Sequence, residues 1–145
     1  MFSGEAALAD KRVAFVVGNG AYKNVPQLPN PPIDAKLMAS TLRNVGFDVV
    51  EGYNLTREKM TEKLFEFGHK AEGADIAVFY YAGHGIAMGG TNYLLPIDAD
   101  LKGEADVKRL FVMVRIASIV PSSDRRLKAV ASVPICEQQI GQMQT

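Results

Sequence analysis

Three short apolar segments, rich in β-branched and aromatic residues, restrict the fold of this chain more than any other feature. They are RVAFVVG (Arg12–Gly18), FDVVEGY (Phe47–Tyr53) and DIAVFYYA (Asp75–Ala82). Such near-continuous apolar runs are typical of strands that are buried on both faces of a parallel sheet. Each is separated from the next by a longer segment with helical spacing. The order strand–helix–strand–helix–strand predicts an α/β sandwich, in which a mostly parallel sheet is flanked by helices.

Two helices are expected between these strands. Asn30, followed by two prolines, supplies a capping residue for a helix near Ile33–Val45, and Gly46 ends it. Thr56 is expected to cap a second helix that runs to Ala71. The residues that keep helical spacing in the first helix are Ile33, Leu37, Met38, Thr41, Leu42 and Val45. The expected buried stripe of the second helix is Met60, Leu64, Phe67 and Ala71.

The second half of the chain gives weaker patterns. GIAMGGTNYLLP predicts a small hairpin that turns at Gly89 and Gly90. The spacing from Asp106 to about Val120 predicts a helix, and LKAVASV (Leu127–Val133) predicts a fourth strand that Pro134 limits.

Composition excludes several classes of partner and site. The chain carries 16 basic and 16 acidic residues, which argues against nucleic acid or an anionic membrane surface as the main partner. It has no apolar run of membrane-spanning length. A single cysteine, Cys136, rules out an internal disulfide framework and a cysteine-rich zinc site. No pattern assigns an oligomeric state.

The N-terminal residues are interpreted as a flexible leader over residues 1–11. AALA before Asp10 resembles the end of a signal-peptide cleavage site. We therefore expect a cytoplasmic protein or, if a signal peptide precedes AALA in the full gene, a periplasmic or secreted one.

A histidine between two glycines, His84 in AGHG, follows the third predicted strand. In open parallel sheets, catalytic and ligand-binding residues lie beyond the carboxyl ends of the strands. Gly83 and Gly85 allow a sharp turn there, the imidazole is a candidate general base, and the backbone N–H of Gly85 is a candidate oxyanion donor. The alternative is a histidine that only hydrogen-bonds the hairpin. The other histidine, His69, is interpreted as a surface residue near a helix end.

Cys136 is the candidate nucleophile, because it follows the predicted fourth strand. If the third and fourth strands are neighbours, their ends bring His84 and Cys136 together, and an imidazole can activate the thiol. The separation, 136 − 84 = 52 residues, is close to the roughly 50 residues between the histidine and cysteine of caspases. The alternative is a cysteine that serves as a small buried hydrophobic residue.

Two other motifs could form a binding site. GNGAYKNV after the first strand has two glycines and could serve a nucleotide-binding α/β protein, but the GxGxxG spacing and an immediate helix are missing. Asp98 and Asp100 in LPIDADL could form a metal pair, although two aspartates in a loop are usually solvated.

Three blocks, AFVVGNGAYKNVPQLPNPPIDAKLMASTLRNVGFDV, FYYAGHG and NYLLPIDADL, resemble the caspase-like domains of bacteria, which are related to metacaspases and caspases. The resemblance covers Arg12 to about Leu110. It implies a caspase-hemoglobinase fold, a polypeptide substrate and a His–Cys dyad, in which His84 matches the histidine and Gly85 an oxyanion-hole residue. It implies no cofactor, although some metacaspases require calcium.

The resemblance weakens before the expected nucleophile. Where the family has a D-A-C or D-S-C motif, this chain has ASVPIC, and Pro134 replaces the aspartate that helps bind a basic P1 side chain in metacaspases. We therefore interpret residues 12–135 as a caspase-like domain that contains only the large-subunit half, as in a truncated or altered relative, and residues 136–145 as a tail outside the family. We expect cysteine endopeptidase activity that is weak or absent; the alternative is an inactive caspase-like binding module or a fragment.

Overall fold

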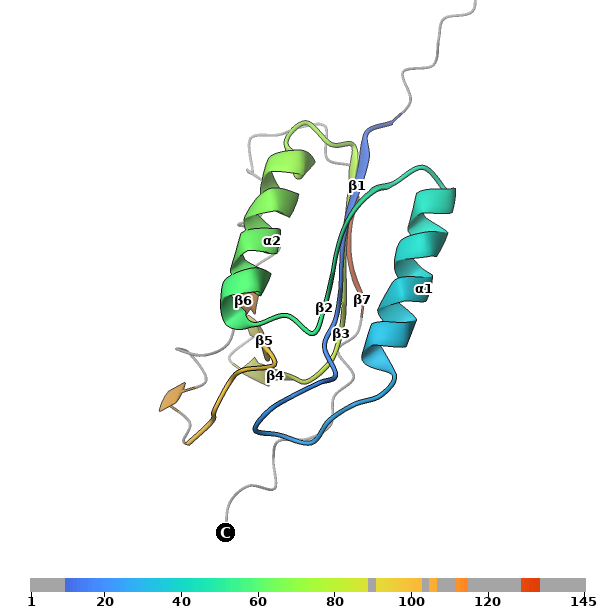
Figure 1. Cartoon of the computed structure of the whole chain (residues 1–145). Coiled ribbons are helices and arrows are strands. Elements are labelled where there is room, and N and C mark those ends of the chain that lie inside the picture. The colour runs from blue at the N-terminus through green and yellow to red at the C-terminus, as the bar shows by residue number, and fades with distance from the viewer. Residues whose placement is uncertain (1–9, 89–90, 103–104, 107–111, 115–128, 134–145) are drawn as a thin grey trace, which may run out of the picture.

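The computed structural model describes residues 10–88, 91–102, 105–106, 112–114 and 129–133. Its main sheet has the strand order β2-β1-β3-β7, and all its pairings are parallel. Helices α1 and α2 lie on opposite faces of this sheet (Figure 1). These elements are β1 (Arg12–Gly18), α1 (Pro31–Asn44), β2 (Asp48–Tyr53), α2 (Arg57–Ala71), β3 (Ile76–Ala82) and β7 (Ala129–Val133). The predicted α/β sandwich with a mostly parallel sheet is confirmed.

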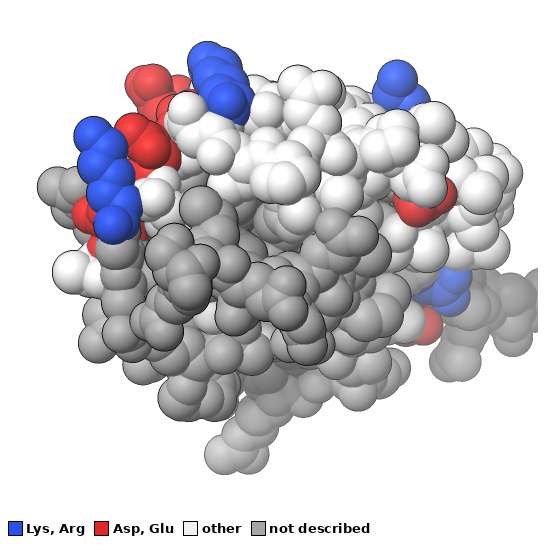
Figure 2. Space-filling view, turned by 90° about the horizontal axis from the view of Figure 1, so that it is seen from below, with Lys and Arg blue, Asp and Glu red and all other residues white. Residues whose placement is uncertain are grey.

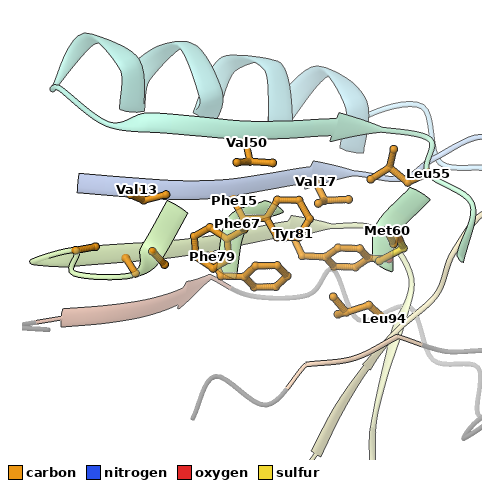
Figure 3. Close-up of a cluster of buried hydrophobic side chains, with 13 residues drawn as sticks. Val13, Phe15, Val17, Val50, Leu55, Met60, Phe67, Phe79, Tyr81 and Leu94 are labelled. Carbon is orange, nitrogen blue, oxygen red and sulfur yellow. The ribbon is translucent and has the colours of Figure 1, made fainter. Parts of the chain in front are cut away.

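Strand β1 is the centre of the main sheet. It pairs with β2 on one side and with β3 on the other, and the register sets Phe15 opposite Phe79 and Gly18 opposite Ala82. The ring of Phe15 packs 5.6 Å from that of Phe67 and 5.3 Å from that of Phe79, measured between centroids. These rings lie in the cluster that fills the space between the sheet and α2 (Figure 3). Burial on both faces explains why the strand has no polar side chain from Val13 to Gly18.

Helix α2 follows its sequence pattern. The Thr56 hydroxyl accepts a hydrogen bond from the backbone N–H of Lys59 at 3.3 Å, as expected of an N-cap. The predicted stripe faces the core: its members are buried, except for Leu64, which is partly buried against the same cluster.

Helix α1 has a different buried face from the one its large apolar residues suggest. Pro31, Ala35 and Ala39 are buried, whereas Ile33 and Leu37 are 64% and 70% exposed. The small residues let α1 approach β1 closely. Asn30 occupies the N-cap position, as expected, but its side chain makes no capping hydrogen bond. The two prolines begin the helix, and Gly46 follows its end with a φ of 87°, as expected.

A second, three-stranded sheet follows β3 and has the order β4-β5-β6. Strands β4 (Gly85–Met88) and β5 (Thr91–Leu94) form the predicted antiparallel hairpin. Strand β6 (Val112–Val114) pairs with β5, so the predicted helix from Asp106 to about Val120 is wrong at these positions. The pairing partner decides the conformation of this β-branched segment. The predicted fourth strand is confirmed as β7.

Within the described ranges, no helix combines the length and the apolar character that crossing a membrane requires.

Replacing Phe15 by alanine should lower the free energy of unfolding by about 3–5 kcal/mol, because it removes a buried ring from between two others. Ile33→Ala is the matched control, since that side chain is mostly exposed, and it should change stability by less than about 0.5 kcal/mol. Urea unfolding followed by circular dichroism measures both. Equal losses in the two variants would contradict the assigned core.

Candidate active site

The candidate site lies where β1 and β3 end side by side. Their register brings the loop after Gly18 next to the turn after Ala82, and the backbone N–H of Asn19 donates to the carbonyl of Ala82 at 2.9 Å. The Asn19 side chain is fully buried. Its Oδ1 accepts from the N–H of Leu55 at 2.9 Å and its Nδ2 donates to the carbonyl of Leu95 at 3.3 Å. One amide therefore connects three segments at this edge of the sheet.

The loop between β1 and α1 is fixed by contacts with distant segments. Oδ1 of Asn54 accepts from the backbone N–H groups of Gly20 and Ala21, both at 3.0 Å. The N–H of Lys23 donates to the carbonyl of Ile97 at 3.0 Å, and that of Leu28 to the carbonyl of Gly20 at 2.9 Å. These bonds hold the loop in a defined position over the end of the sheet.

The two glycines of GNGAY have a structural role in this loop. A Cβ on Gly18 would lie 2.4 Å from the carbonyl oxygen of Pro31, and a Cβ on Gly20 would lie 2.0 Å from that of Leu28. Both positions need glycine because the chain's own backbone comes so close. The glycine pair is therefore explained without a nucleotide.

His84 follows β3 and is buried, with 4% of its surface exposed. From its place at the end of the third strand we expect a partly exposed imidazole in a concave surface, and this expectation is wrong. Tyr22, from the loop after β1, packs against the ring. Its Nε2 lies 2.9 Å from the carbonyl oxygen of Pro26. A carbonyl only accepts hydrogen bonds, so Nε2 must carry a proton. Nδ1 is buried and has no hydrogen-bond partner among the described residues.

This arrangement has a chemical consequence. In the neutral ring with a proton on Nε2, Nδ1 carries the free lone pair. A buried polar atom without a partner is rare in folded proteins and calls for an explanation. A lone pair held in this way can accept a proton from a group that approaches it.

Two tyrosines surround the His84 backbone. Tyr22, from the loop, accepts from the N–H of His84 at 2.8 Å, and Tyr81, from β3, donates to the carbonyl of His84 at 2.7 Å. Burial raises the pKa of Tyr22 to about 12 and the pKa of Tyr81 well above its ordinary value. Both phenols therefore keep their protons at neutral pH.

The glycines on either side of His84 differ from each other. Gly83 has a φ of 153° and forms the predicted turn. Gly85 begins β4, pairs with Leu94, and is not among the described glycines with positive φ. It is thus part of an extended strand. Its oxyanion role stays a prediction.

Cys136 lies outside the described residues, so its distance from His84 stays a prediction. The strand that precedes it is described. Strand β7 runs parallel to β3 as its neighbour, with Val133 opposite Tyr80. The adjacency on which the pairing of His84 with Cys136 depends is therefore confirmed.

The remaining candidate residues have structural contacts. His69 is exposed on α2, and its Nδ1 lies 3.6 Å from a carboxylate oxygen of Glu72. Asp98 accepts from the backbone N–H of Arg57 at 3.0 Å, at the start of α2, and Asp100 lies 3.7 Å from the Lys102 ammonium. Across the described ranges, no cluster of three or more His, Cys, Asp or Glu side chains is suited to a metal ion.

The surface around the site carries few charges. Lys23 is the one Lys, Arg, Asp or Glu residue in the sequence between positions 19 and 33, and the sequence from 82 to 97 contains none. Seen from below, many described residues on this end of the molecule are uncharged (Figure 2). These two segments therefore supply few ionised side chains near His84.

Sequence reasoning missed Pro26, Tyr22 and Asn19, which build the surroundings of His84. Each acts across more than 35 positions of the chain, so no local period reveals it. The sequence offers one signal, which is the loop itself: it is long and rich in Asn, Gly and Pro, and yet it contains a tyrosine. In the structure this tyrosine is buried.

Removing the Tyr22 hydroxyl should change how stability depends on alkaline pH. The unfolded phenol loses its proton near pH 10.0, whereas the folded one keeps it to about pH 12. The native protein thus binds more protons in this range, and its stability falls as pH rises. Wild type should lose up to about 1.4 kcal/mol per pH unit more than Tyr22→Phe between pH 10 and 12. Parallel urea-unfolding curves over this range would contradict the assignment.

Comparison with known proteins identifies the family. The family model described as "Caspase domain" matches residues 11–139. "Mucosa-associated lymphoid tissue lymphoma translocation protein 1" of Homo sapiens and its Mus musculus homolog are each 34% identical to the chain over 92 residues. The aligned part covers 63% of this chain and 11% of each relative, so the chain corresponds to a small part of their length. Because the family model matches most of the sequence, the chain belongs to the caspase domain family.

Proposed function

We propose that the chain is a cysteine endopeptidase domain of the metacaspase-like kind, with His84 as general base and Cys136 as nucleophile. The observation that carries this proposal is the hydrogen bond between Nε2 of His84 and the carbonyl of Pro26. In the neutral imidazole this bond leaves Nδ1 unprotonated, and Nδ1 is buried without a partner among the described residues. A catalytic base needs this state before substrate arrives.

The sheet supports Cys136 as the group that meets this lone pair. Val133, the last residue of β7, lies opposite Tyr80, and His84 comes four positions after Tyr80. Cys136 comes three positions after Val133. Since the two strands are parallel neighbours, we expect both residues at the same edge of the sheet.

The proposed reaction has two steps. Nδ1 of His84 takes the proton of the Cys136 thiol, the thiolate attacks the carbonyl carbon of the scissile peptide bond, and the amine leaves with the proton from the imidazolium. Water then releases the acyl group, with His84 again as base. The backbone N–H groups of Gly85 and Cys136 are proposed to stabilise the oxyanion, which they do best where water is excluded.

Pro134 favours low turnover. It therefore also favours the second candidate function, which is an inactive caspase-like binding module. It stands where the family has an aspartate that helps bind a basic P1 side chain, and it removes a backbone donor just before the nucleophile. Arg and Lys are the P1 residues that the resemblance implies, so both are included in the test with neutral alternatives.

Turnover of fluorogenic peptides, with and without calcium, tests the proposal. We expect slow but measurable cleavage that falls about 10²–10⁴-fold in both His84→Ala and Cys136→Ala. His69→Ala is the matched control, because it removes the exposed histidine and should leave turnover unchanged.

Labelling by a peptidyl fluoromethylketone separates the two candidates. A working dyad gives labelling at Cys136 that depends on His84. A binding module gives slow labelling that is the same in wild type and His84→Ala, and this result together with no turnover would refute the endopeptidase proposal.

A further inference from the structure

Three hydrogen bonds form a closed ring that begins and ends on the His84 residue. The His84 N–H donates to Oη of Tyr22 at 2.8 Å, the hydroxyls of Tyr22 and Tyr81 are 3.2 Å apart, and Tyr81 donates to the His84 carbonyl at 2.7 Å. The Tyr81 hydroxyl is also 3.0 Å from the carbonyl of Leu95, so its proton is shared between two carbonyls.

The direction of each bond follows from the atoms available. Tyr81 directs its proton to carbonyl oxygens, which cannot donate in return. The Tyr22 oxygen accepts from the His84 N–H and has one proton of its own, which is left for the Tyr81 oxygen. Every link then runs in one sense: from the His84 N–H to Tyr22, to Tyr81 and back to the His84 carbonyl. Such a chain of donors strengthens each bond within it.

Gly83 makes room for this ring. A Cβ at this position would lie 2.5 Å from the Tyr22 hydroxyl and 2.8 Å from the Tyr81 hydroxyl. Its φ of 153° is also one that other residues rarely adopt. The glycine before His84 therefore allows two phenols to meet directly behind the histidine backbone.

We infer that Tyr22 and Tyr81 are positioning residues for His84, and that their closed ring fixes the direction of its imidazole. The ring of Tyr22 also packs against the imidazole, with centroids 4.7 Å apart and planes inclined by 49°. The backbone bonds and this contact together aim Nε2 at the Pro26 carbonyl and hold Nδ1 free. The catalytic part of this inference rests on the proposed function.

The tautomer of the His84 imidazole can be measured whether or not the protein cleaves a peptide. The chain has two histidines, and exposed His69 serves as an internal reference in ¹⁵N spectra of labelled imidazoles. Wild type should show His84 in the Nε2-protonated tautomer. In Tyr22→Phe and Tyr81→Phe we expect a mixture of tautomers at His84, and amide hydrogen exchange at His84 about tenfold faster or more in Tyr22→Phe. Tyr80→Phe, on the neighbouring position of β3, should match wild type.

Kinetics add a second measurement. Opening the ring should lower kcat about 10- to 100-fold while KM stays within about twofold, because substrate contacts are unchanged. The double variant should lose less than the product of the two single losses, since both hydroxyls belong to one ring.

The spectra decide the inference even if wild type cleaves no peptide. A wild-type tautomer and unchanged amide exchange in both folded phenylalanine variants would overturn it. Should Tyr22→Phe fail to fold, Tyr81→Phe decides by the tautomer readout, because loss of either hydroxyl opens the ring. Altered tautomers, combined with absent turnover and with labelling that does not depend on His84, would refute the endopeptidase proposal alone.

Discussion

The parallel pairing of β1 with β3 is the interaction on which the candidate site depends. Both strands are largely buried, and their register places Gly18 opposite Ala82. The two connections that leave this edge therefore start side by side, although they lie about 60 positions apart in the chain. A shift of one residue in the register would turn the side chains of one strand to the other face of the sheet, and it would also separate the Pro26 loop from His84.

Much of the rigidity of the site comes from amide and hydroxyl groups rather than from ion pairs. Asn19 and Asn54 connect the loop to the β2–α2 turn, and the two tyrosines connect it to His84. Neutral groups suit a buried position, because burying an unpaired charge is far more costly than burying a satisfied polar group. The sequence around the imidazole follows the same pattern, because residues 82 to 97 include no Lys, Arg, Asp or Glu.

The strands and α2 could be predicted because their apolar pattern repeats with the period of the structure that they form. The buried face of α1 could not, because Ala35 and Ala39 pack tightly against β1 and yet carry little hydrophobic signal beside the exposed Ile33 and Leu37. Strand β6 could not be predicted either, since a short β-branched segment takes its conformation from its partner β5. Within the site, His84 can be predicted because two glycines flank it in the sequence. The contacts of Pro26 and Tyr22 cannot, because tertiary structure sets them.

The hydrogen bond from His84 to Pro26 uses a main-chain carbonyl, and this affects how the site can vary. Substitution changes side chains, so alanine scanning of this loop would leave the acceptor in place and would overlook it. What the bond does require is the path of the backbone, which depends on loop length and on the two glycines that pack against it. Insertions or deletions in this loop would therefore disturb the contact more than a change of side chain at position 26.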